Sequence, residues 1–282
     1  MRHLFCALLL LAALRPAAAQ APQQPWFFAV LSDPQFGMYA KDANFQQETA
    51  NFEFVIANLN RLHPRFVVIC GDLVNKPGDT AEIAEYKRIL GELAPSIPVY
   101  NVAGNHDVGN IPTVESLAAY RAAIGPDYYT FTAGNLFGIV LDSNLIRSPE
   151  TDPAAAEQQQ EWLNKKLSKA QTNPDQQLVV FQHIPYFLHD AGEPDDYFNI
   201  TEPARRKYLD LLEHAGVQYI FAGHYHRNAG GTDGALTEVV TGAAGMPLGG
   251  SLSGFRIVTV TGRKLNATWY SLGEIPNQIK LP

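Results

Sequence analysis

The sequence predicts an α/β fold that contains two β-sheets. Short apolar runs suited to buried strands alternate with helical patterns along most of the 282-residue chain. Strands separated by helices typically form a largely parallel sheet covered by helices. After residue 223 only short strands with Gly-rich turns are expected, which suggests a second, antiparallel sheet packed on the first.

Each expected element has its own pattern. Buried strands are expected at residues 26–32, 66–71, 97–103, 136–142, 177–182 and 217–222. Apolar residues recur every three or four positions in segments 52–62, 83–90 and 162–167, which predicts amphipathic helices there. The later short strands are expected at residues 236–240, 255–260 and 266–271.

The first twenty residues have the pattern of a secretory signal peptide. A basic start precedes an apolar stretch from Leu4 to Leu14 and a small-residue site at Ala17 to Ala19. A membrane anchor needs roughly 18 or more apolar residues, and Arg15 interrupts this stretch too early. We therefore expect an exported, periplasmic or extracellular protein whose residues 21–282 form a single domain without a membrane span.

The charge balance disfavours nucleic acid as a partner. The formal net charge is −7, and removal of the expected signal peptide, with two arginines and no acid, makes it −9. Such a chain is not suited to bind phosphate backbones. Loss of Cys6 would leave Cys70, within the apolar FVVIC run, as a buried core residue without an intrachain partner.

Polar side chains follow five of the expected strands. They are Asp33, Asp72, Asn105 with His106, His183, and His224 with His226. Carboxyl ends of strands in an open α/β sheet share one edge, where ligands bind. Any one of these residues alone could merely end a strand, because Asp and Asn are common in turns. Their recurrence at successive strand ends instead predicts one converging site.

The residue types in this set indicate metal ions. Carboxylates, an amide and imidazoles without a thiolate form an oxygen and nitrogen donor set suited to Mn, Fe or Zn. The set contains seven candidates, which fit two ions better than one. A carboxylate is the natural bridge between two cations, and Asp72 would hold them roughly 3.5 to 4 Å apart.

Five blocks of the sequence resemble the calcineurin-like metallophosphoesterase family. They read DPQ, GDLVN, GNHD, QH and GHYH, in this order, between residues 33 and 226. The extended first block, DPQFG, is similar to one branch of that family. The resemblance implies a four-layer αββα sandwich of two mixed sheets flanked by helices, and a hydrolase of phosphoesters that uses two divalent or mixed-valence metal ions.

The resemblance also implies a role for each site residue. The first metal ion would be bound by Asp33, Gln35, Asp72 and His226. The second would be bound by Asp72, Asn105, His183 and His224. His106 would face the phosphate and assist the leaving group, with Asn75 as its orienting partner and Asp107 as a further catalytic candidate.

The chain departs from the family pattern at Gln35, where most members have His. An amide oxygen donates less strongly than imidazole and suits harder ions. This predicts weaker binding at the first site and a preference for Mn or Fe. Asn75 likewise stabilises a charged His106 less well than a carboxylate would.

The implied mechanism uses activated water. Two divalent ions lower the pKa of a shared water from about 15.7 to about 7, which supplies a bridging hydroxide for in-line attack on phosphorus. A phosphomonoesterase is the first interpretation and a phosphodiesterase the second. A non-catalytic metal-binding scaffold is the alternative from a different class.

The substrate is less well indicated. Loops at residues 145–153, 186–201 and 242–254 are expected to wall the site. The middle loop is acidic with aromatic residues, which disfavours nucleic acid and tolerates a small-molecule phosphoester or a phosphoprotein; a solvated surface loop is its simpler interpretation. The oligomeric state stays open.

Overall fold

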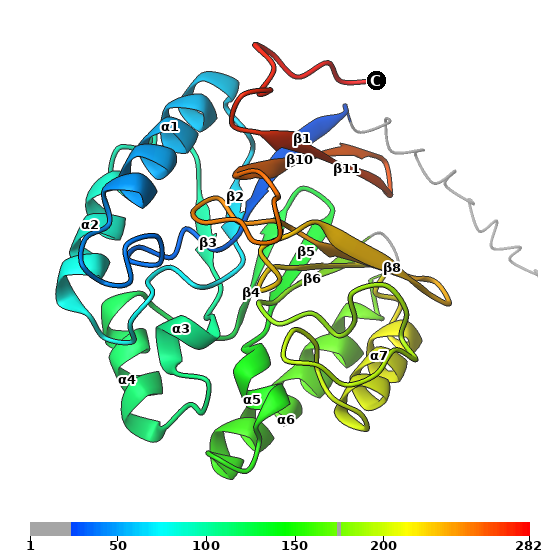
Figure 1. Cartoon of the computed structure of the whole chain (residues 1–282). Helices are drawn as coiled ribbons and strands as arrows, with labels where there is room; N and C mark the ends of the chain where they lie inside the picture. Colours follow the sequence, from blue (N-terminus) through cyan, green and yellow to red (C-terminus); the bar gives the residue numbers. More distant parts are fainter. Residues whose placement is uncertain (1–23, 174–175) are drawn as a thin grey trace, which may run out of the picture.

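The computed structural model describes residues 24–173 and 176–282. Two β-sheets pack face to face and helices cover the outer face of each, so that the layers run helix, sheet, sheet, helix (Figure 1). This arrangement confirms the predicted α/β sandwich of two mixed sheets. The expected signal peptide, residues 1–20, lies outside the described residues, and the single domain over residues 21–282 stays a prediction.

The five-stranded sheet has the order β11-β10-β1-β2-β3. Its parallel part consists of β1 (Trp26–Leu31), β2 (Val67–Ile69) and β3 (Val99–Asn101). The last two strands of the chain, β10 (Gly254–Thr261) and β11 (Lys264–Ser271), join antiparallel beside β1. The carboxyl ends of β1, β2 and β3 therefore meet at one edge, as the sequence predicts.

The six-stranded sheet has the order β4-β5-β6-β7-β9-β8. Its parallel strands are β5 (Leu136–Val140), β6 (Gln177–Phe181), β7 (Tyr219–Ala222) and β9 (Leu236–Val240). The two outer strands, β4 (Tyr129–Ala133) and β8 (Ala229–Asp233), run antiparallel to their neighbours.

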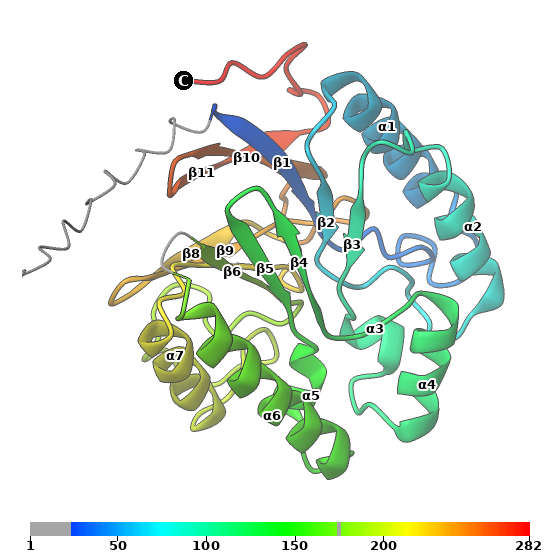
Figure 2. The same cartoon turned by 180° about the vertical axis from the view of Figure 1, so that it is seen from behind.

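Helices fill the two outer layers (Figure 2). The five-stranded sheet is covered by α1 (Gln46–Leu62) and α2 (Thr80–Leu90), and the six-stranded sheet by α6 (Pro153–Ala170) and α7 (Ala204–His214). The short helices α3 (Asn105–Val108) and α5 (Ser143–Arg147) follow strands, and α4 (Val114–Ala123) follows α3. None of the helices in the described residues has the length and apolar character that crossing a bilayer requires.

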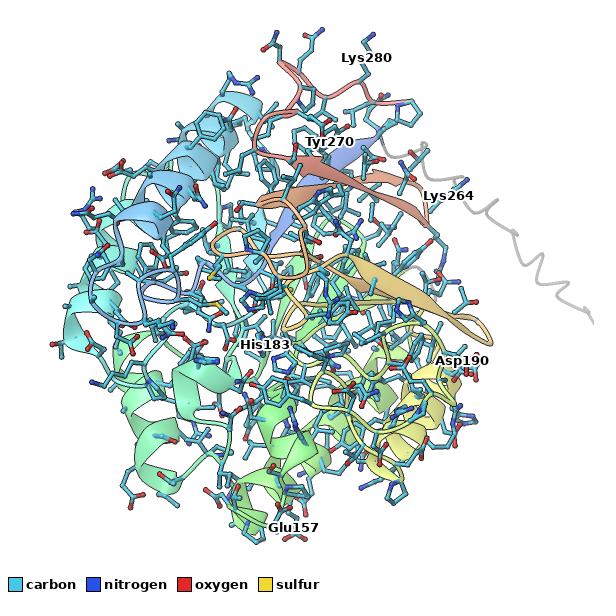
Figure 3. The ribbon with its side chains drawn as sticks, in the orientation of Figure 1. Glu157, His183, Asp190, Lys264, Tyr270 and Lys280 are labelled. Carbon is cyan, nitrogen blue, oxygen red and sulfur yellow. The ribbon has the colours of Figure 1, made fainter. Side chains whose placement is uncertain are left out.

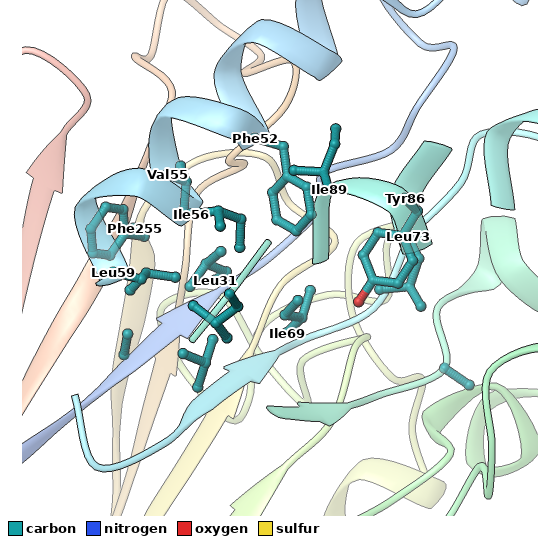
Figure 4. Close-up of a cluster of buried hydrophobic side chains, with 14 of the residues drawn as sticks. Leu31, Phe52, Val55, Ile56, Leu59, Ile69, Leu73, Tyr86, Ile89 and Phe255 are labelled. Atoms are coloured by element: carbon teal, nitrogen blue, oxygen red, sulfur yellow. The ribbon is translucent and has the colours of Figure 1, made fainter. Parts of the chain in front are cut away.

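Apolar side chains fill the three interfaces between the layers. Figure 4 shows the cluster under α1 and α2, where Phe52 of α1 and Tyr86 of α2 stack above Leu31 and Ile69 of the sheet. The middle interface is aromatic: the Phe28 ring stacks on Phe66 with centroids 4.6 Å apart and meets the rings of the other sheet edge-on. Burial of this apolar area is the main stabilisation of the sandwich.

The chain after residue 223 does not form a sheet of its own, contrary to the prediction. β8 and β9 extend the six-stranded sheet, whereas β10 and β11 extend the five-stranded sheet. Alternating apolar residues indicate that a segment is a strand, but they do not identify its partner. The partner is decided by which open sheet edge the chain reaches.

Two strands and two of the longer helices are absent from the sequence prediction. β4 is a partly exposed outer strand without an apolar run, and β8 (AGGTD) contains two glycines that are more typical of a turn. α4 buries only Leu117 and Tyr120, and α7 carries the fully buried Arg205 among its apolar residues. Each of these elements is fixed by its neighbours more than by its own pattern.

The middle interface predicts a large loss of stability for Phe221→Ala. Phe221 is fully buried on β7, and its ring stacks 5.5 Å from that of Phe181. Removal of such a ring leaves a cavity that costs about 3–5 kcal/mol. Urea unfolding should show this decrease in the free energy of unfolding, whereas the control Phe54→Ala, at a ring 48% exposed on α1, should change it by less than about 0.5 kcal/mol.

Candidate metal centre

The predicted site residues converge where strands of both sheets end. Asp33 follows β1, Asp72 follows β2, Asn105 begins α3 after β3, His183 follows β6 and His224 follows β7. All five are buried. His183, labelled in Figure 3, lies near the middle of the molecule. The structure therefore brings these polar groups together, as the sequence predicts, but they come from the strand ends of two sheets and not from one edge of a single sheet.

The backbone is forced into a rare conformation at these positions. Of the eight non-glycine residues with positive φ in the described chain, five are predicted ligands: Asp33, Gln35, Asp72, His224 and His226. This left-handed conformation costs about 1–3 kcal/mol at such residues and clusters at functional sites. Each positive φ turns the chain sharply at a strand end, which places the side chain over the edge of the sheet.

Asp72 belongs to two groups of possible metal ligands. In each group the donor atoms lie within 4.8 Å of one another: Asp72 with His183 and His224, and Asp72 with Asp33 and His226. Asp72 Oδ2 lies 3.2 Å from His183 Nε2, and Asp33 Oδ1 lies 3.4 Å from His226 Nε2. Two donor groups that share one carboxylate have the composition of a two-ion site.

Main-chain carbonyls orient all three histidines of these groups. His183 Nδ1 lies 2.7 Å from the Cys70 oxygen, and His226 Nδ1 lies 2.6 Å from the Met246 oxygen. His224 Nε2 lies 3.0 Å from the Tyr197 oxygen. A carbonyl only accepts, so the proton of each neutral ring is on that nitrogen and the other nitrogen has its lone pair available for a metal ion.

The Gln35 side chain presents an oxygen that fits a cation. Its Nε2 donates to Asn75 Oδ1 at 3.0 Å, and Asn75 Nδ2 in turn donates to Asp42 Oδ1 at 2.5 Å. Gln35 Oε1 is buried and has no hydrogen-bond partner among the described residues. An orphaned buried acceptor costs about 1–3 kcal/mol, so this oxygen fits a metal ligand better than it fits a structural amide.

Asn105 is oriented in the same way. Its Nδ2 donates to Asn110 Oδ1 at 2.9 Å and to Tyr197 Oη at 3.2 Å. Its Oδ1 consequently points inward and lies 3.0 Å from His183 Nε2. The amide oxygen thus joins the group around Asp72, as predicted from the sequence.

His106 lies at the edge of the group and is half-buried. Its backbone N–H donates to Asp72 Oδ1 at 2.8 Å, and its Nδ1 lies 2.7 Å from the carbonyl oxygen of Asn75. Asn75 is therefore its orienting partner, but through the main chain and not through the amide side chain that the sequence suggested. The Asn75 amide instead holds Gln35.

Asp107 does not face the site as a catalytic group. Its Oδ1 accepts the backbone N–H groups of Leu73 and Val74 at 2.9 and 3.3 Å, and its Oδ2 accepts that of Gly104 at 2.8 Å. These bonds tie α3 to the segment that carries Asp72. We therefore correct the catalytic assignment of Asp107 to a positioning role, because a carboxylate bonded to three amides has no oxygen directed at a substrate.

Comparison with known proteins identifies the family. Residues 28–228 match the sequence model of the family described as calcineurin-like phosphoesterase. The human serine/threonine-protein phosphatase CPPED1 is 39% identical over 267 residues, which cover 89% of this chain and 85% of the human protein. The chain belongs to the calcineurin-like phosphoesterase family. The zebrafish serine/threonine-protein phosphatase CPPED1 is 34% identical over 266 residues, which cover 89% of this chain and 86% of that protein.

Solved structures agree on the fold of this phosphoesterase. A dimetal phosphatase from Danio rerio superposes with a TM-score of 0.64 at 16% identity, covering 90% of this chain and 98% of that one. Purple acid phosphatase from yellow lupin gives a TM-score of 0.61 at 16% identity, covering 91% of this chain and 53% of that one. These structures show the fold, whereas the family match, the curated relatives and the two donor groups make the chain a metal-dependent hydrolase of phosphoesters.

The charged groups in the metal centre of this phosphoesterase shift one another's pKa values. Burial alone would raise the pKa of Asp72, but His183, with smaller contributions from His106 and His224, lowers it overall. Burial would lower the pKa of His183, but the carboxylates of Asp72 and Asp33 and the Cys70 carbonyl together raise it to about 9. Burial, assisted by the charge of His183, lowers the pKa of His224 to about 3. A cation bound here would replace the proton on His183, because a ligating imidazole is neutral.

Sequence reasoning missed two residues that contact the centre. Tyr197 reaches Asn105 with its hydroxyl and His224 with its carbonyl, and Ser32 Oγ donates to Asp33 Oδ2 at 2.5 Å. Neither residue stands in one of the five blocks. The only signal for Tyr197 is its place in the acidic, aromatic loop that was expected to wall the site.

The Gln35 geometry predicts the effect of Asn75→Ala. This change removes the acceptor that holds the Gln35 amide but keeps the main-chain carbonyl that holds His106. We expect the affinity for the more weakly bound metal ion to fall about 10- to 100-fold. Calorimetric titration of metal-free protein with Mn²⁺ measures this, with Asn58→Ala, an exposed amide on α1, as the control. Unchanged Mn²⁺ affinity would contradict the role given to the Gln35 oxygen.

Proposed function

We propose that this chain is a phosphomonoesterase that uses two metal ions held at the Asp72 centre. The observation that carries the proposal is the pair of donor groups that share Asp72. The curated relatives at 34% and 39% identity are named serine/threonine-protein phosphatases, which supports a phosphoserine or phosphothreonine substrate. Hydrolysis of a phosphodiester is the alternative that the experiments below distinguish.

Seven side chains would hold the two ions. The first ion would be bound by Asp33, Gln35, Asp72 and His226. The second would be bound by Asp72, Asn105, His183 and His224. The available histidine nitrogens and the orphaned Gln35 oxygen support this division. An amide in place of imidazole at the first ion favours Mn or Fe, since harder ions accept amide oxygen more readily.

When bound, the two ions supply an activated water as nucleophile and neutralise charge on the phosphoryl oxygens. Asp72 keeps the two donor groups together, and the backbone N–H of His106 fixes the orientation of its Oδ1. The Asn75 carbonyl holds the proton of His106 on Nδ1, so that Nε2 faces outward to the substrate. In its protonated form this Nε2 donates a proton to the leaving oxygen.

We also propose that the protein is exported. The basic start, the apolar stretch and the Ala17 to Ala19 site of the first twenty residues support this proposal. N-terminal sequencing of the protein recovered from the native host's extracytoplasmic fraction would find an end near residue 20. Recovery of the intact chain in the cytoplasm would refute export.

Metal removal should abolish activity reversibly. A chelator strips ions from carboxylate and imidazole donors, so hydrolysis of p-nitrophenyl phosphate should fall to background and return with added Mn²⁺ or Fe²⁺. The ratio of kcat/KM for p-nitrophenyl phosphate to that for bis-p-nitrophenyl phosphate decides between the monoester and diester functions. A higher value for the diester would replace the phosphomonoesterase proposal, and no hydrolysis of either ester by the metal-loaded protein would favour a scaffold.

His106→Ala separates proton transfer from metal binding. The side chain contacts Asn75 and is not in either donor group, so both ions should remain bound. Loss of a general acid lowers kcat by about 10²- to 10⁴-fold. Steady-state kinetics together with elemental analysis measure both quantities, and His63→Ala, at an exposed histidine after α1, is the control. Full turnover in the His106 variant would remove this role.

A further inference from the structure

A loop between β6 and α7 reaches the metal centre through two aromatic residues. The Tyr197 ring lies 4.9 Å and the Phe198 ring 5.6 Å from the ring of His224, measured between centroids. Tyr197 is 44% exposed. It therefore stands at the boundary between the buried centre and solvent, where a substrate would enter.

Both polar groups of Tyr197 are fixed by the centre. Its hydroxyl accepts from Asn105 Nδ2 at 3.2 Å and donates to Asn110 Oδ1 at 3.2 Å. Its carbonyl oxygen accepts from His224 Nε2 at 3.0 Å. Tyr197 thus contacts a predicted ligand of the second ion with its side chain and another with its main chain.

Arg147 donates to the same carbonyl oxygen. Its Nη1 donates to the Tyr197 oxygen at 2.8 Å, and its guanidinium lies 5.1 Å from the centroid of the Tyr197 ring. Arg147 is the last residue of α5, which begins at a cap formed by Asp142 after β5. Strand β5 and helix α5 therefore position the guanidinium so that it and His224 both donate to the Tyr197 carbonyl oxygen.

The charge of Arg147 has no carboxylate partner among the described residues. Arg88, Arg121, Arg205 and Arg206 each form an ion pair within 4.0 Å, whereas Arg147 forms none and bonds only the Tyr197 carbonyl. Arg147 is half-buried in a chain of formal net charge −7. A partly desolvated guanidinium with free N–H groups is suited to receive the oxygens of a phosphate.

We propose that Arg147 anchors the phosphoryl group of the substrate, with Tyr197 as the residue that positions it. This inference rests on the proposed function and adds a basis for its substrate class. A phosphomonoester has three non-bridging oxygens, so one remains for Arg147 while the others face the ions. A diester has only two, and both would face the ions, so that none remains for Arg147. Arg147 therefore selects monoesters over diesters.

Arg147→Met tests the anchor because it keeps the length of the side chain and removes its charge and donors. We expect kcat/KM for p-nitrophenyl phosphate to fall about 10- to 100-fold, as for loss of a charge-assisted hydrogen bond, with a change below about threefold for bis-p-nitrophenyl phosphate. Arg147→Lys should recover part of the monoester activity. Arg206→Met, at an ion-paired surface residue on α7, is the matched control and should leave both esters unaffected.

Binding of inorganic phosphate provides a measurement that does not depend on turnover. Calorimetric titration of the Mn²⁺-loaded protein should show about tenfold or weaker phosphate affinity in Arg147→Met than in the parent chain, at unchanged metal content and thermal midpoint. Equal phosphate affinity in the two proteins, no phosphate binding by either, or an equal loss for monoester and diester would overturn the anchor. Phosphate binding that depends on Arg147 in a protein that hydrolyses neither ester would retain the anchor and refute the phosphomonoesterase.

Discussion

The burial of carboxylates at the junction of the two sheets is the constraint on which the rest of the centre depends. Asp33 and Asp72 are almost completely buried and lie among three imidazoles. Without positive charge, such a pair carries a large desolvation cost. In the described chain His183 offsets part of this cost by holding a proton beside Asp72. Metal ions at the same place would supply more positive charge and would give the Gln35 oxygen a partner, so binding of metal ions would also stabilise the fold.

The fold meets this constraint with local strain and close approach. Five predicted ligands adopt positive φ, and the hydrogen bonds of the surrounding main chain hold them there. Gly104 shows how tightly the segments meet, because a Cβ at this position would lie 2.2 Å from the Asp72 nitrogen. The loops at the ends of β2 and β3 can therefore touch only if no side chain separates them.

Asn75 links the two chemical functions of the site. Its side chain holds the Gln35 amide and its carbonyl holds His106, so one residue positions both a predicted metal ligand and the histidine proposed to assist the leaving group. This dual contact gives a physical reason for the amide pair in place of the family's usual histidine. A glutamine needs a donor or acceptor that fixes which end of its amide faces the ion, and Asn75 provides the acceptor. On the opposite side, Tyr197 connects the ligand groups with the charge of Arg147.

The sequence by itself determined the α/β class, most of the strands and the polar residues that meet at the centre, because apolar period and residue type are local properties. It did not show that these residues come from two sheets. It did not determine the distribution of the last four strands between two sheets, which depends on the open edge that each reaches. It also did not show that Asn75 contacts His106 through its main-chain carbonyl and not through its side chain. Nor did it show that the Asp107 oxygens accept backbone amides, or that Arg147 lies close to His224. Those contacts join residues far apart in the chain, and only tertiary packing decides which atoms of such residues meet.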